Sequence, residues 1–249
     1  LALRAGGGLA HVEWGYVILI ATLVQAVLAS AVLILLPLWV GSTGARAGAL
    51  MWGRWRLVLY FLALGLGFMF VEMAFIQRFV LFLGHPLYAI AVVLAAFLVF
   101  AGLGSGYAER LARHLDTRLP RLGGLPSIAT AIALLAGVYI GVLPSLLNIL
   151  LPLPEGARIT LAVLLIAPLA FLMGMPFPLG LARLSREAPG MIPWAWSING
   201  CASVVSVVLA AVLAIHIGFT AVVGCALAIY LIAAMLFAGG RRFEVPYRS

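Results

Sequence analysis

Two formal charges interrupt an apolar stretch of the chain at residues 68–86, FMFVEMAFIQRFVLFLGHP. Glu72 and Arg78, with Gln77 just before the arginine, stand among Phe, Val, Met, Leu and Ile. In lipid, an ionisable side chain costs about 2.5 to 3.5 kcal/mol at the centre of a helix, so it marks a function or a partner. A spacing of six residues turns Glu72 and Arg78 about 120° apart on a helix. Side chains that pair on one helix are three or four residues apart, so each charge needs a partner elsewhere.

The composition predicts that this stretch lies in a membrane. Of the 249 residues, 65% are hydrophobic and 9% are charged, whereas soluble domains carry about 25% charged residues. A helix that crosses a bilayer needs about 20 apolar residues, and backbone groups in lipid must be satisfied within the segment. We therefore predict an all-α polytopic membrane helix bundle of about seven transmembrane helices, at residues 14–40, 55–84, 86–107, 126–151, 158–182, 193–217 and 219–239.

The arginines predict how the bundle is oriented. In this topology, most arginines fall on the membrane surface opposite the N-terminus. They are Arg46, Arg54, Arg56, Arg110, Arg113, Arg118, Arg121, Arg183, Arg186, Arg241, Arg242 and Arg248. The other surface holds only Arg4 and Arg158. Cytoplasmic loops carry an excess of basic residues, so the N-terminus is expected outside and the C-terminus in the cytoplasm, across a bacterial cytoplasmic (inner) membrane.

This topology divides the chain into three parts. Residues 1–13 are expected to form an N-terminal extramembrane segment that continues from an upstream part, because the chain begins with Leu1. Residues 14–240 form the helix bundle, and residues 241–249 form a cytoplasmic tail. The loops at 41–54 and 108–125 are too short to hold a catalytic domain.

Depth in the membrane suggests partners for the two charges. Counted back from Gly84 at about 1.5 Å per residue, Arg78 lies about 9 Å below the outer surface, from where it can reach the headgroups. Glu72 lies about 18 Å below that surface, near the middle of the bilayer. Glu72 is either protonated and hydrogen-bonded to neighbours or a site for a cation or proton. The polar side chains near its depth are Gln25, Tyr139, Ser203 and Ser206.

Prolines predict interruptions in two of the helices. Pro144 falls in the fourth span, and Pro176 and Pro178 fall near the cytoplasmic end of the fifth. A proline inside a helix leaves a carbonyl four residues earlier without its partner. Such breaks are either ordinary kinks or, as in transporters, the lining of a binding site.

Small residues predict where helices pack closely. Gly102 and Gly106 stand four residues apart. Asn199 and Ser203 have the same spacing, and Gly200 follows Asn199 directly. Small residues with this spacing allow two backbones to approach in a membrane. We therefore expect Gly102, Gly106, Asn199 and Gly200 at helix contacts.

No catalytic residue, metal site or cofactor is predicted. His11, His85 and His216 all fall at the same membrane surface, but their spacing matches no set of metal ligands. The net charge of +8 is explained by topology and by anionic lipid headgroups, so nucleic acid is not expected as a partner.

Three sequence runs carry a resemblance to a known family. They are GLGFMFVEMAFIQRFVLFLGHPLYA at 65–89, PLAFLMGMPFPLGLARL at 168–184 and PWAWSINGCASVVSVVLA at 193–210. Together they resemble the membrane portion of bacterial spermidine synthase-like proteins, in which apolar helices are joined to a soluble aminopropyltransferase-like domain. The resemblance implies a partner domain that binds decarboxylated S-adenosylmethionine and a polyamine. The glycine-rich turn that such a domain uses is not found in this sequence, so no catalytic residue is carried over.

Three functions follow from these observations. The first is a non-catalytic membrane domain of a spermidine synthase-like protein, acting as an anchor or scaffold in the lipid bilayer. The second is an accessory structural subunit that packs against other membrane protein subunits. The third is a transporter of a small cation or polyamine that uses Glu72.

Overall fold

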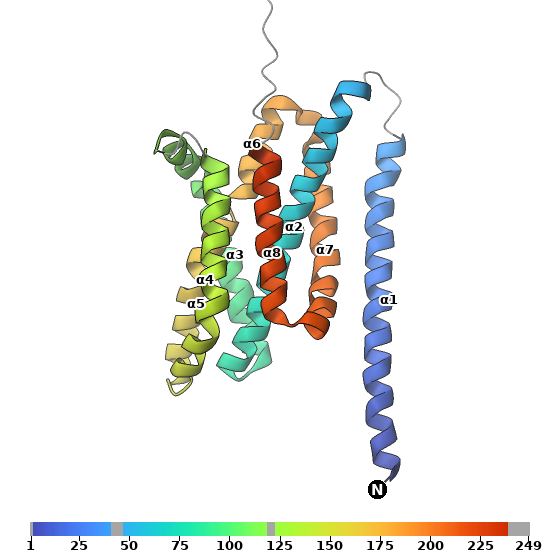
Figure 1. The fold of residues 1–249 in the computed structure, drawn as a ribbon, viewed down its shortest axis with the longest axis vertical. Helices are drawn as coiled ribbons and strands as arrows, with labels where there is room; N and C mark the ends of the chain where they lie inside the picture. Colours follow the sequence, from blue (N-terminus) through green and yellow to red (C-terminus); the bar gives the residue numbers. More distant parts are fainter. Residues whose placement is uncertain (1, 41–46, 119–122, 239–249) are drawn as a thin grey trace, which may run out of the picture.

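The computed structural model describes residues 2–40, 47–118 and 123–238, with side chains described at 14–33, 55–118 and 123–237. Apart from short connections, this part of the chain is helical (Figure 1). Its elements are α1 (Ala2–Val40), α2 (Ala47–Leu83), α3 (Pro86–Arg118), α4 (Gly124–Leu150), α5 (Glu155–Met173), α6 (Pro176–Glu187), the 3₁₀ turn η1 (Pro189–Met191), α7 (Ile192–Ile217) and α8 (Phe219–Ala238).

The predicted all-α architecture is confirmed. Within the described residues, seven helical stretches are long and apolar enough to cross a membrane, with α5 and α6 forming one of them. The apolar stretch of α1 runs from Trp14 to Leu33. By helix length and composition the chain is therefore a multi-pass membrane protein.

Several predicted boundaries need correction. Residues 108–118 were expected in a loop, yet they continue α3 to Arg118, and α2 begins at Ala47 inside the expected loop 41–54. Residues 2–13 are helical, as part of α1, and their place outside the membrane stays a prediction. Arginine-rich ends predict a loop because of their charge, but a basic residue in a last helical turn complements the helix dipole and is compatible with helix. The predicted tail at 241–249 lies outside the described residues.

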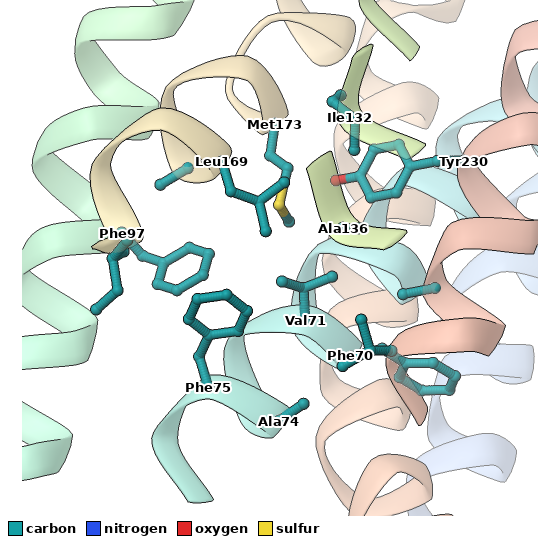
Figure 2. Close-up of a cluster of buried hydrophobic side chains, with 14 of the residues drawn as sticks. Phe70, Val71, Ala74, Phe75, Phe97, Ile132, Ala136, Leu169, Met173 and Tyr230 are labelled. Carbon is teal, nitrogen blue, oxygen red and sulfur yellow. The ribbon is translucent and has the colours of Figure 1, made fainter. Parts of the chain in front are cut away.

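Helix α2 occupies the centre of the bundle. It packs mainly against α7, α8 and α3, and 56% of its membrane stretch is buried, against 6% for α1. Figure 2 shows its Val71 and Phe75 among Phe97 of α3, Leu169 of α5 and other buried apolar side chains. The helix that carries the charged stretch is thus the one most enclosed by protein.

Two very short turns join helices at the end of the bundle opposite the arginine-rich loops. Gly84 ends the hydrogen bonding of α2, with a φ of 80°, and Gly218 does the same for α7 at the same φ. A positive φ is strained for residues with a Cβ, so glycine suits both turns. Because Gly218 alone separates α7 from α8, the first residues of α8 are held close to the end of α7.

Helices α3 and α5 cross where two glycines face the partner's backbone. A Cβ on Gly104 would overlap the carbonyl of Phe171, and a Cβ on Gly174 would overlap the carbonyl of Ala101. These contacts correct the predicted packing glycines, because a Cβ on Gly102, Gly106 or Gly200 would meet nothing within 4 Å. Spacing alone identifies a helix face but does not say whether that face meets lipid or another helix.

The prolines differ in their effect on the helices. Helix α4 runs through Pro144 without interruption, which corrects the break predicted there. The break predicted at Pro176 and Pro178 corresponds to the step from α5 to α6, and Pro176 is the first residue of α6. Proline is well tolerated at that first position because its missing N–H has no acceptor there.

We predict that Gly104→Ala destabilises the bundle by about 1 to 3 kcal/mol, because the new methyl group must displace a neighbouring backbone. The measurement is thermal unfolding of the purified protein in detergent. Gly102→Ala is the matched control, since it adds the same methyl group to open space on the same helix. Equal losses for the two variants would contradict the close crossing of α3 and α5.

Candidate polar site of the membrane bundle

Side chains from α7 bind backbone carbonyls of α2. The Asn199 amide donates to the carbonyl of Phe61 at 3.2 Å, and the Ser206 hydroxyl donates to the carbonyl of Leu66 at 3.0 Å. Between them Gly65 lies so close to Asn199 that any Cβ there would overlap its carbonyl. Asn199 therefore lies at a helix contact, as predicted for it, and glycine on α2 makes the approach possible.

Two tyrosines connect other helix pairs in the same way. The Tyr60 hydroxyl of α2 donates to the carbonyl of Pro176 at 2.6 Å, and the Tyr139 hydroxyl of α4 donates to the carbonyl of Leu165 at 2.6 Å. Buried hydroxyls need such partners because burying one unpaired is costly. The start of α6 is thereby tied to α2, and α4 is tied to α5.

Glu72 has no such partner. It is 5% exposed and lies seven residues after Gly65, on the same side of α2. No hydrogen bond or ion pair joins its carboxylate to another residue that the structure describes. Glu72 is thus an enclosed acid whose neighbours do not offer it a donor or a counter-charge.

The polar residues expected near Glu72 are engaged elsewhere. Tyr139 and Ser206 donate to the carbonyls already named, and Ser203 donates to the carbonyl of Asn199 within α7 at 2.9 Å. Similar depth did not predict which helix face each residue occupies. Ser203 binds a carbonyl of its own helix, as Ser and Thr often do, whereas Tyr139 and Ser206 bind carbonyls of neighbouring helices.

Gln25 lies apart from this group. It is exposed on α1, beside an apolar hollow of about 810 Å³ that is lined by Ala21, Val24, Leu28, Ala29, Val32 and Leu33. Figure 1 shows α1 at the edge of the bundle, next to α7. Gln25 is therefore no partner of Glu72, because the two side chains belong to different surroundings.

Arg78 lies at a small pocket between α2, α4 and α8. Its Nη2 donates to Thr220 Oγ1 at 3.1 Å, and the pocket of about 30 Å³ also touches Tyr139 and Pro144. Gln77, its neighbour in sequence, is half-buried on α2. Three residues that sequence analysis treated separately, Arg78, Tyr139 and Pro144, are thus brought together, whereas Glu72 does not line this pocket.

A second arginine has a role that the sequence did not reveal. Arg158 was counted only among the loop residues, but its Nη1 donates to the carbonyl of Phe82 at 2.9 Å. Phe82 belongs to the last turn of α2, whose carbonyls have no partner within the helix. A cation there also favours the helix dipole. The position of Arg158 three residues after the start of a helix gave no signal of this contact.

The fold and site define a multi-pass helical membrane protein in which several polar side chains connect neighbouring helices. No family model matches the sequence, and neither curated proteins nor solved structures provide a match. The likeness to spermidine synthase-like membrane domains therefore stays a prediction.

We predict that Ser206→Ala lowers stability by about 0.6 kcal/mol, the average for a hydrogen bond between membrane helices. Ser203→Ala is the matched control on the same helix, because its hydroxyl bonds only within α7, and it should have a smaller effect. The measurement is unfolding of both variants in mixed micelles with a denaturing detergent. A larger loss for Ser203→Ala would show that the contact with Leu66 does not hold α7 on α2.

Proposed function

We propose that the chain is a non-catalytic integral membrane domain of a spermidine synthase-like protein and serves as an anchor or scaffold in a bacterial cytoplasmic membrane. The family assignment rests on the three sequence runs described above. The proposed partners are bilayer lipids and a soluble spermidine synthase-like domain.

The observation that carries the anchor role is how the bundle uses its interior polar groups. Asn199, Ser206, Tyr60 and Tyr139 all donate to backbone carbonyls of neighbouring helices. The space around α2 is filled by aromatic and small apolar side chains (Figure 2). A pore or carrier needs polar groups that are free to replace the hydration shell of its substrate, and here these groups already hold helices together.

The cavity sizes support the same role. The pocket beside Arg78 holds about 30 Å³, whereas sites for small molecules are clefts of about 300 to 1,000 Å³. The larger hollow beside α1 is lined by apolar side chains and Gln25 alone, so it suits acyl chains and not a polyamine. An anchor requires neither a substrate site nor a path.

We predict that liposomes containing the purified chain take up radiolabelled spermidine no faster than liposomes without protein. Glu72→Gln should leave this background rate unchanged, because the described pockets offer Glu72 no route to a substrate. Proton flux is followed in the same liposomes with a trapped pH-sensitive dye. Uptake that the wild type supports and Glu72→Gln abolishes would replace the anchor role with that of a cation or proton transporter.

The proposed orientation places the N-terminus outside and the arginine-rich loops in the cytoplasm. It can be tested with Thr117→Cys and Glu155→Cys, two exposed positions at opposite ends of the bundle, in a background in which Cys201 and Cys225 are replaced by alanine. In intact cells a membrane-impermeant maleimide should label position 155 and not position 117. Labelling of both after lysis is the control, and the reverse pattern in intact cells would invert the topology.

A second candidate function, an accessory subunit of a larger membrane complex, is favoured by one observation. Gln25 is exposed on α1, although polar side chains in membrane helices usually face protein and bind across helices. A neighbouring subunit on α1 would supply that contact. Recovery of the chain from mild detergent as a monomer without companions would remove this candidate.

A further inference from the structure

Arg78 is a membrane arginine without a counter-charge. Its single hydrogen-bond partner among the described residues is the neutral hydroxyl of Thr220. The salt bridge found among the described residues joins Arg183 to Glu187 on α6 and does not involve Arg78. A guanidinium has five N–H donors in a planar fork. Most of its donor capacity is therefore not used by the described residues of the protein.

The surroundings of Arg78 favour an anion. Thr220 accepts the hydrogen bond from Arg78, so its own hydroxyl proton is free to be donated. Thr220 is the second residue of α8, where the first N–H groups have no acceptor within the helix and the dipole is positive. The pocket residues include no carboxylate. Arg78, Thr220 and the first residue of α8, Phe219, thus line the same pocket.

The shape of the pocket indicates where such an anion would lie. Its volume of about 30 Å³ has room for about two water molecules, so a larger anion occupies the mouth and not the interior. Arg78 lies five residues before the end of α2, about 7 to 8 Å along the helix axis. This depth corresponds to the boundary between the hydrocarbon core and the headgroups.

We propose that Arg78, Thr220 and the start of α8 form a binding site for a phosphate group at the mouth of this pocket. The phosphate belongs either to the headgroup of an anionic lipid or to free inorganic phosphate. Arginine suits this ligand because its planar fork can bind two phosphate oxygens at once. This proposal does not depend on the anchor role, since a bound lipid or counter-anion is compatible with other functions of a membrane protein.

The test compares ligands and matched variants of the full chain in non-ionic detergent. Phosphatidylglycerol, phosphate-free diacylglycerol and inorganic phosphate are added separately, and binding is followed by native mass spectrometry and by the thermal unfolding midpoint. Arg78→Gln should retain phosphatidylglycerol about fivefold less than the wild type, the factor for one basic residue near a membrane surface. Arg186→Gln, which removes an exposed arginine from α6, should bind as the wild type does.

The three ligands separate the two sources of phosphate. Stabilisation that depends on Arg78 with phosphatidylglycerol alone identifies a lipid, and the same dependence with inorganic phosphate identifies the free ion. Thr220→Val keeps Arg78 and the side-chain shape, so it tests the site even where Arg78→Gln does not fold, and it should also weaken binding. The proposal is overturned if diacylglycerol binds as well as phosphatidylglycerol, or if neither phosphate ligand distinguishes the two pocket variants from Arg186→Gln.

Discussion

The structure depends on the close approach of other helices to the backbone of α2. In lipid there is no water to satisfy polar groups, so a hydroxyl or amide inside the bundle must find a protein acceptor. Carbonyls of α2 accept from Asn199 and Ser206 of α7 and from Arg158 at the start of α5. A carbonyl oxygen has two lone pairs, so it can accept these bonds without leaving the helix ladder. Glycine at position 65 makes the approach geometrically possible.

Much of the architecture could be predicted from the sequence because hydrophobicity and helix length are fixed by the thickness of a bilayer. Seven helices long and apolar enough to cross a membrane are confirmed among the described residues, whereas residues 108–118, which were expected in a loop, are helical. The orientation stays a prediction. Helix faces could not be predicted, because lipid and protein are equally apolar neighbours. For this reason the spacing of Gly102 and Gly106 indicated a helix contact, although Gly104 between them is the one of these three glycines that meets another backbone. The prediction of hydrogen-bond partners for Glu72 was wrong for the same reason. The depth of a residue specifies its layer in the membrane but not the direction in which its side chain points.

The polar residues divide into two groups with different physical roles. The first group, formed by Asn199, Ser206, Tyr60 and Tyr139, makes hydrogen bonds between helices, which fits a scaffold. Those near the end of the bundle, Arg78 and Thr220, keep unused donors next to a pocket, which fits a phosphate ligand. Glu72 belongs to neither group, because it is buried and yet, unlike the members of either group, has no hydrogen-bond partner among the described residues. Its position in the most buried helix therefore makes Glu72 the residue whose replacement best distinguishes a membrane anchor from a transporter.

The single glycine between α7 and α8 has a consequence for how the chain is inserted during synthesis. The two helices are joined by Gly218 alone, and one residue spans at most about 3.6 Å, so the first turn of α8 must stay at the membrane surface at which α7 ends. Helices tied this closely are suited to enter the bilayer together, as one antiparallel hairpin.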